Sequence, residues 1–173
     1  QTLQTFDDGT AITSAAYSPD GRLLLTTSSP LRTPAAKKSE PVSNGITNSA
    51  DAVPTLWNAA TGTRFILLND ASLDTVLGTE FSRDSQRVAL PGRDHSVRVY
   101  STADGQLQRL LKGHSDRIMT ISFSPDGKRL VSTGLDKTVR VWDLESGAEL
   151  RPFPVEAVPN QQLTAVFADS DRL

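Results

Sequence analysis

The chain has 173 residues, two histidines, no cysteine and a formal net charge of −2 at neutral pH. This length fits one domain, and the near-neutral charge excludes an electrostatic footprint for nucleic acid or an anionic membrane. No apolar run approaches about 18 residues, and the N-terminal segment lacks both a basic cluster and an apolar stretch, which excludes a transmembrane helix and a signal peptide. Short apolar runs alternate with Gly, Asp and Pro, a pattern typical of strands and tight turns, so the predicted class is all-β.

The first predicted unit spans about residues 10–69 and contains the turn "YSPDG", followed by "DAVPTLW" at 51–57. It is interrupted at 30–50 by "PLRTPAAKKSEPVSNGITNSA", which holds three prolines and carries a net charge of +2. Such a composition cannot bury a core and predicts a mobile loop. Two interpretations stay open: a tolerated insertion at a hairpin tip, or a segment that docks on an acidic partner through Arg32, Lys37 and Lys38.

The second and third units, at about 73–112 and 117–153, repeat one spacing. The turn "FSRDS" starts at Phe81 and "FSPDG" starts at Phe123, which lies 42 residues later. In each unit a second aromatic follows after 19 residues, in "DHSVRVY" (94–100) and "DKTVRVW" (136–142). An Asp stands six residues before that aromatic in all three units, which gives the pairs Asp51 and Trp57, Asp94 and Tyr100, and Asp136 and Trp142.

Each unit contains four strand-like runs. In the third unit they cover residues 118–123, 129–133, 138–144 and 148–153, joined by short links with Gly or Asp. Four antiparallel strands in about 42 residues, repeated along the chain, indicate blades of a β-propeller. We therefore predict an all-β propeller segment over residues 1–173, with about three complete blades and partial blades at both ends, the last starting at 162–173.

Residues 113–143 read "GHSDRIMTISFSPDGKRLVSTGLDKTVRVWD" and resemble a WD repeat, a likeness that the spacing extends over most of the chain. The resemblance implies a structural tetrad of hydrogen-bonded side chains that pins the loop before the first strand to the turn after the second. The matching residues are His114, Ser132, Asp136 and Trp142. A catalytic dyad or metal site at His114 and Asp136 is disfavoured, because a zinc site needs three or four ligands and the chain has two His and no Cys.

The other units depart from this pattern. The positions that correspond to His114 hold Asp8, Ser72 and Val158, while Leu90 replaces Ser132 and Tyr100 replaces Trp142 in the second unit. We therefore expect only the third unit to form the complete tetrad. His95 follows the turn aspartate Asp94 directly, so it corresponds to Lys137 and is expected to be exposed.

The resemblance also implies a partner-binding rim, formed by the links between second and third strands and by the links between blades. On this rim we expect Arg93, His95, Arg117, Leu135 and Lys137, a mixture of polar and apolar groups that suits a protein or peptide partner. For each residue singly, an ordinary solvated turn position is an equally good interpretation. The insertion at 30–50 falls on the same rim.

Three blades do not close a ring, since propellers have about four to eight. The terminal blades are expected to expose apolar faces, such as that of Val139 and Val141, and open strand edges. We therefore expect either further blades from a larger propeller or self-association of short chains. The lack of an initiator Met favours the larger propeller.

Three functions remain open from the sequence. The favoured one is a protein–protein interaction scaffold, because the recognisable residues are structural. The second is a sensory or regulatory propeller of a larger protein, for example one linked to a bacterial kinase, and the third is a propeller hydrolase. No nucleophile elbow, phosphate-binding Gly loop or His/Cys cluster is present, so we expect no enzyme activity, cofactor or metal. The compartment stays open, with the cytoplasm favoured.

Overall fold

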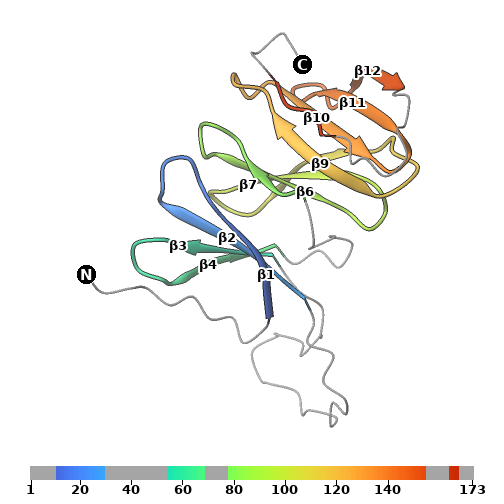
Figure 1. Ribbon diagram of the computed structural model, residues 1–173. Helices are drawn as coiled ribbons and strands as arrows, with labels where there is room; N and C mark the ends of the chain where they lie inside the picture. The colour runs from blue at the N-terminus through green and yellow to red at the C-terminus, as the bar shows by residue number, and fades with distance from the viewer. Residues whose placement is uncertain (1–10, 30–53, 69–77, 155–163, 168–173) are drawn as a thin grey trace, which may run out of the picture.

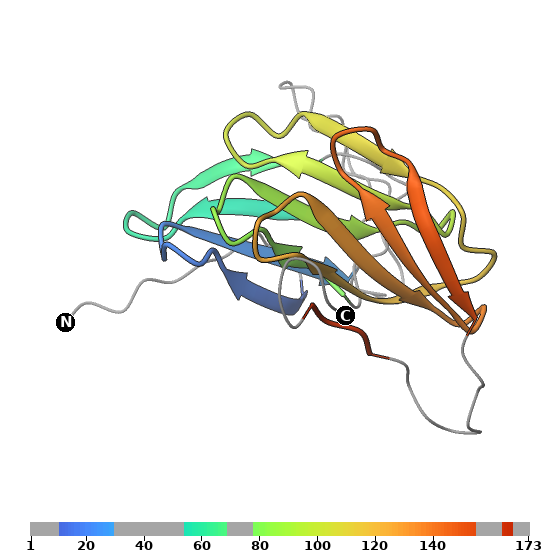
Figure 2. The same cartoon turned by 90° about the horizontal axis from the view of Figure 1, so that it is seen from above.

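The computed structural model describes residues 11–29, 54–68, 78–154 and 164–167. Within these ranges the chain forms three four-stranded sheets, and every strand pair in them is antiparallel. The sheets follow one another as blades, with the green second sheet between the blue-to-teal first and the orange third (Figures 1 and 2). The all-β prediction is confirmed. No helix of the described part is long and apolar enough to cross a membrane.

The strand boundaries repeat from blade to blade. The first blade consists of β1 (Ala11–Tyr17), β2 (Leu23–Ser29), β3 (Thr55–Asn58) and β4 (Arg64–Leu67). The second consists of β5 (Glu80–Phe81), β6 (Arg87–Pro91), β7 (Val97–Ser101) and β8 (Leu107–Leu111). The third consists of β9 (Ile118–Phe123), β10 (Arg129–Gly134), β11 (Thr138–Asp143) and β12 (Glu149–Pro154).

These boundaries lie close to the strands predicted for the third unit. The second blade differs, because its first strand is only two residues long. The insertion at 30–50, including Arg32, Lys37 and Lys38, lies outside the described residues, as does Asp51. Of the partial blade predicted at 162–173, only residues 164–167 are described, and they form no strand. The blade limits therefore stay a proposal at both ends of the chain.

The turn between the first two strands has the same construction in every blade. In the third blade the Ser124 hydroxyl donates to the Asp126 carboxylate at 2.6 Å and accepts the Arg129 N–H at 2.8 Å. Ser18 and Asp20 repeat this arrangement in the first blade, and Ser82 and Asp84 repeat it in the second. The left-handed position in this turn is Gly21, Ser85 or Gly127, with φ of 71°, 60° and 68°. Only Ser85 carries a Cβ there, which raises the conformational energy of the second turn.

A bulge marks the same place in each blade. The pairing of the third and fourth strands shifts at Trp57, Tyr100 and Trp142, the three aromatics that follow the turn aspartates. An extra residue at this point increases the local twist of the strand and re-aims the side chain beside it. The repeated sequence thus specifies a β-bulge at the same place in each blade, as well as the regular pairing of the strands.

Apolar side chains fill the two spaces between the blades. Between the first and second blades the buried cluster consists of Leu25, Leu56, Leu68, Phe81, Val88, Leu90 and Tyr100. Between the second and third it consists of Ala89, Val97, Val99, Leu111, Ile118, Ile121, Phe123, Leu130, Trp142 and Leu144. Successive residues of β6 enter different clusters, since side chains alternate across a strand. Both faces of the second blade are therefore core.

Polar contacts also join the blades. The Asp20 N–H donates to Ser85 Oγ at 3.1 Å, from the first blade to the second. The Arg109 side chain donates to the backbone carbonyls of Leu144 and Glu145 at 2.8 and 2.6 Å, from the second blade to the third. Burial raises the pKa of Glu80, against hydrogen bonds from Ser122 and the Phe123 N–H that lower it. Backbone and side-chain groups thus hold the blades in a fixed arrangement.

The expectation of exposed end faces is correct at one end only. Tyr17, Phe81 and Phe123 occupy equivalent positions, but Tyr17 is 61% exposed whereas both phenylalanines are 6% exposed. Each phenylalanine packs on the preceding blade, and Tyr17 has no described blade before it. At the other end the expectation is wrong for Val141, which is 6% exposed, while Val139 is half-buried.

Candidate functional site

The structure brings the four residues of the implied tetrad together in the third blade. His114 Nδ1 lies 2.9 Å from a carboxylate oxygen of Asp136, and its Nε2 lies 2.8 Å from Ser132 Oγ. The Trp142 indole donates to the same Ser132 oxygen at 2.9 Å. His114 precedes β9, Ser132 lies on β10, Asp136 lies in the β10–β11 turn, and Trp142 lies on β11. One network therefore connects three strands and a connecting loop.

The direction of each hydrogen bond in the tetrad follows from the two end groups, the Trp142 indole and the Asp136 carboxylate. The indole N–H can only donate, so Ser132 accepts there and donates its own proton to His114 Nε2. His114 then carries its proton on Nδ1 and donates it to Asp136 as a neutral imidazole. Burial lowers the pKa of His114, although the neighbouring Asp136 raises it, which agrees with the neutral form. Every member of the chain is satisfied, as a buried polar network requires.

Asp136 is also held by donors outside the tetrad. The backbone N–H groups of Ser115 and Thr138 and the Thr138 hydroxyl reach its carboxylate at 2.8–3.1 Å. Burial raises the pKa of Asp136, but the hydrogen bonds from Ser115, Thr138 and His114 outweigh it and lower the pKa overall. Gly134 leaves room for this network, because a Cβ there would lie 2.7 Å from both Asp136 Oδ1 and His114 Nδ1.

The second blade holds its turn aspartate in a different way. Arg98, on β7, donates to both carboxylate oxygens of Asp94 at 2.8 and 3.0 Å. Its side chain is 7% exposed, and its hydrogen bonds to Asp94 hold the pKa of that carboxyl far below the ordinary range. Sequence reasoning missed Arg98. The available signal was the absence of a histidine and the presence of Leu90 where the third blade has Ser132.

The first blade retains a fragment of the network. The Trp57 indole donates to Thr26 Oγ1 at 2.8 Å, and this pair corresponds to Trp142 and Ser132. The guanidinium carbon of Arg64 lies 5.3 Å from the centre of the Trp57 ring, a cation–π distance. The predicted partner Asp51 lies outside the described residues. Thr26 is a second residue that the sequence reasoning did not single out.

The predicted partner-binding residues lie on one rim, formed by the β6–β7 and β10–β11 links and the link before β9; it is here called the tetrad rim, because the tetrad of the third blade lies there. Arg93 and His95 lie in the β6–β7 link, Arg117 precedes β9, and Leu135 and Lys137 lie in the β10–β11 link. Leu135 is 52% exposed, and its N–H donates to the Arg117 carbonyl at 2.8 Å. Arg93 and Lys137 are exposed, whereas His95, expected to be exposed, is half-buried. Both His95 and Lys137 have left-handed backbones, with φ of 63° and 64°.

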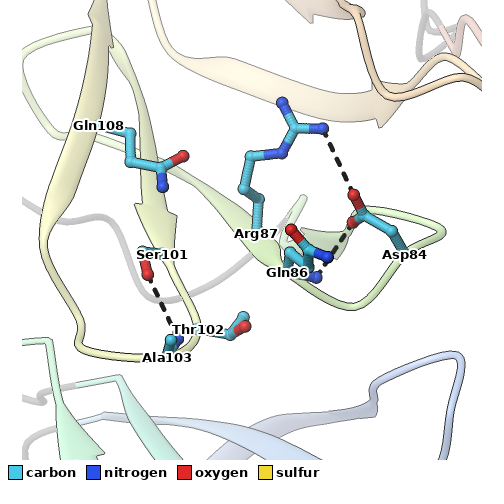
Figure 3. Close-up of a pocket in the computed structure, with 7 residues that line it drawn as sticks. All are labelled: Asp84, Gln86, Arg87, Ser101, Thr102, Ala103 and Gln108. Atoms are coloured by element: carbon cyan, nitrogen blue, oxygen red, sulfur yellow. Dashed lines mark hydrogen bonds and ion pairs between the residues drawn. The ribbon is translucent and has the colours of Figure 1, made fainter.

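A hollow of about 380 Å³ lies on the opposite rim, between the β5–β6 and β7–β8 turns of the second blade (Figure 3). Its lining is polar except for Ala103, and the other lining residues are Asp84, Gln86, Arg87, Ser101, Thr102 and Gln108. No motif of the sequence indicates this place, since the resemblance to a WD repeat implies binding on the tetrad rim.

The geometry of His114 does not suit catalysis. Its side chain is 1% exposed, and both ring nitrogens are occupied by Asp136 and Ser132. A general base must reach the proton that it abstracts, directly or through one water. In the described part of the chain, no three His, Cys, Asp or Glu side chains are grouped so as to hold a metal ion.

The three sheets follow one another as blades of a β-propeller, and hydrogen-bonded side chains hold the turn aspartates of the second and third blades. A family model, the WD domain, G-beta repeat, matches residues 1–29 and 105–143. These two matches support the likeness to WD repeats that the sequence indicates. Repeats of this kind generally mediate protein–protein interaction and are typically non-enzymatic. No curated protein matches the chain.

Proposed function

We propose that this chain is an interaction module that binds a protein or peptide partner through the tetrad rim. The observation that carries this proposal is Leu135, a large apolar side chain that is 52% exposed on a turn held by the tetrad. An exposed apolar residue on a rigid turn offers contact area at little cost in conformational entropy. The tetrad serves as a support for this surface, since it fixes the turn on which Leu135 lies.

Cationic residues lie on the same rim as Leu135. Arg93 and Lys137 are exposed, and Arg117 is half-buried beside the Leu135 backbone. Basic groups around an apolar centre favour a partner with an apolar anchor flanked by acidic side chains. The charges increase the rate of encounter and select the orientation, while burial of Leu135 provides affinity.

The test is a quantitative comparison of partner capture by three forms of the chain. Leu135→Asp with Lys137→Glu reverses the charge and removes the apolar anchor, and we expect it to weaken binding of a captured partner by roughly a hundredfold. Lys128→Glu is the matched control, because Lys128 is exposed on the opposite rim. Equal capture by all three forms would show that the partner binds elsewhere.

A further inference from the structure

The hollow on the opposite rim contains a guanidinium whose hydrogen-bonding groups are not used. Arg87 begins β6, and its side chain is 21% exposed. The Phe123 ring of the third blade lies 5.7 Å from its guanidinium carbon and supports one face of the group. Its ion pair with Asp84 is 3.8 Å long, which is beyond hydrogen-bond distance. Among the described residues, the Arg87 guanidinium donates no hydrogen bond. The charge is therefore fixed in place while its donors remain available.

Asp84 pairs with this guanidinium only weakly, because the turn already uses one oxygen of its carboxylate. Asp84 Oδ1 accepts the Ser82 hydroxyl at 2.5 Å and the Gln86 N–H at 3.0 Å. Only Oδ2 faces Arg87, at the long distance given above, and the Asp84 side chain is 46% exposed. Exposure of this kind weakens the ion pair further through solvent screening. The Arg87 guanidinium can therefore still bind an anion.

A side-chain amide lies across the hollow from Arg87. Figure 3 shows the Gln108 amide, on β8, on the other side of the open space from the Arg87 guanidinium. A second hollow of about 370 Å³ shares Arg87 and Gln108 and continues to Arg109, Val99 and Leu144. Because Leu144 belongs to the third blade, the two hollows form one groove that crosses from the second blade to the third.

We propose that this groove binds an extended segment of a partner protein through an acidic side chain, whose carboxylate lies between Arg87 and Gln108. A guanidinium presents two parallel N–H groups that match the two oxygens of a carboxylate. A phosphate dianion fits less well, because it would meet Asp84 with only one guanidinium whose donors are available, since Arg109 already donates to three backbone carbonyls. The groove continues over Val99 and Leu144, which are 1% and 5% exposed and form its floor, so its length fits an extended segment rather than a single carboxylate. This site is separate from the tetrad rim and adds a second contact to the proposed function.

The test uses two capped peptides that differ in one group, acetyl-Gly-Glu-Leu-Gly-amide and the same peptide with Gln in place of Glu. Each is titrated into the ¹⁵N-labelled chain, and the Nε–Hε signal of Arg87 and the side-chain amide signals of Gln108 are followed. We expect saturable shifts with the Glu peptide and binding weaker by roughly tenfold or more with the Gln peptide. Equal binding of both peptides, or no saturable shift with either, would overturn the proposal.

Two variants place the binding in the groove. Gln108→Glu, at an exposed position, adds a carboxylate that competes for Arg87, and it should weaken the Glu peptide by roughly tenfold. Arg87→Lys should do the same, since lysine lacks the two-pronged geometry. If Arg87→Lys fails to fold, Gln108→Glu alone decides. Unchanged affinity in Gln108→Glu would refute the site.

The controls separate this proposal from the one for the tetrad rim. Arg83→Lys changes an exposed arginine of the same turn that does not line the groove, and Leu135→Asp changes the other rim; both should bind the Glu peptide normally. Free glutamate should bind more weakly than the peptide. If it binds equally well, the groove recognises a small carboxylate and the proposed partner segment is wrong.

Discussion

The second and third blades satisfy the same aspartate with different residues. In the third blade, His114 bonds Asp136, and Arg140 turns to Glu149 at 2.7 Å. In the second blade, Arg98 occupies the position equivalent to Arg140 but bonds Asp94 instead. Gly92 and Gly134 stand at matching places, and a Cβ at either would collide with the group that holds the aspartate.

This difference shows which part of the repeat the fold requires. Each link between the second and third strands needs a donor for the turn carboxylate, since a carboxylate in a packed turn must be hydrogen-bonded. The identity of that donor can change. A neutral imidazole extends the network to Ser132 and Trp142, whereas the guanidinium ends it within one turn, because Leu90 replaces the hydroxyl. The hydrogen-bond network of the third blade therefore reaches its buried interior, whereas the hydrogen bonds to Asp94 in the second blade stay at the rim.

The largest expected effect is the loss of His114. His114→Ala removes a donor from Asp136 and a partner from Ser132, and it leaves a cavity beside Trp142. We expect the free energy of unfolding to fall by about 2–3 kcal/mol, measured by chemical denaturation. His95→Ala, on the equivalent rim of the second blade, should change it by less than about 0.5 kcal/mol. Similar losses in both variants would mean that the network adds nothing beyond a surface histidine.

A smaller effect is expected when the ion pair of the second blade is broken. A double-mutant cycle of Arg98→Met and Asp94→Ala should give a coupling energy of about 1 kcal/mol, limited by the exposure of Asp94. The control is the same cycle on Arg87 and Asp84, whose 3.8 Å separation should give a coupling near zero. A larger coupling for the second pair would contradict the geometry described for both.

The two blades should respond to acid in different ranges. Burial holds the pKa of His114 below its ordinary value of 6.5, so the unfolded chain binds more protons than the folded one as pH falls below that value. The third blade's network therefore loses stability as pH falls below about 6.5. The Arg98 hydrogen bonds lower the pKa of Asp94 from 3.8, so that pair keeps its contribution until pH falls through the acid range below this value.

The measurement is the free energy of unfolding against pH for the unaltered chain and for His114→Ala. The gap between the two curves should narrow from neutral pH toward pH 5, because the variant has no imidazole to protonate at this position. A gap that widens with acid would show that the folded protein holds His114 as a cation, and the hydrogen-bond directions given for the tetrad would then be wrong.

The smallest effect concerns the residue after each turn aspartate. Lys137 has a φ of 64°, a left-handed backbone that costs a residue with a Cβ about 1 kcal/mol and glycine almost nothing. Lys137→Gly should raise the free energy of unfolding by about 0.5 kcal/mol after the entropy cost of glycine. Lys128→Gly, where φ is not positive, should lower it. Thermal unfolding of both variants checks the difference in sign.

The sequence predicted the regular features of the fold because they repeat. The 19-residue spacing between aromatics placed the strands of the third blade within about a residue, and the likeness to a WD repeat identified all four residues of the tetrad. Repetition also explains why the role of Arg98 as the partner of Asp94 was not predicted from the sequence. "SVRVY" and "TVRVW" contain arginine at the same position, so pattern alone cannot indicate that one faces Asp94 and the other Glu149. The absent histidine and Leu90 decide that choice through three-dimensional packing.

The groove on the opposite rim could not be predicted for a related reason. It depends on Arg87, Gln108 and Leu144, which come from separate strands and turns and belong to no motif. The corresponding residue of Arg87 is Leu23 in the first blade, where it packs against the apolar cluster instead. The third blade has Arg129 at this position, so the groove depends on the side chains around the arginine, and these are visible only when the neighbouring strands and turns are placed.

The exposure of Tyr17 reports whether another sheet covers the first blade. Tyr17 is the only tyrosine among the three equivalent aromatics, and its phenol lies largely in solvent, whereas Tyr100 is buried. A reagent that nitrates phenols in proportion to their accessibility should therefore modify Tyr17 quickly and Tyr100 slowly. Any sheet that covers the first blade would slow the reaction at Tyr17 alone. The nitration rate of Tyr17 thus measures whether this face of the first blade is covered.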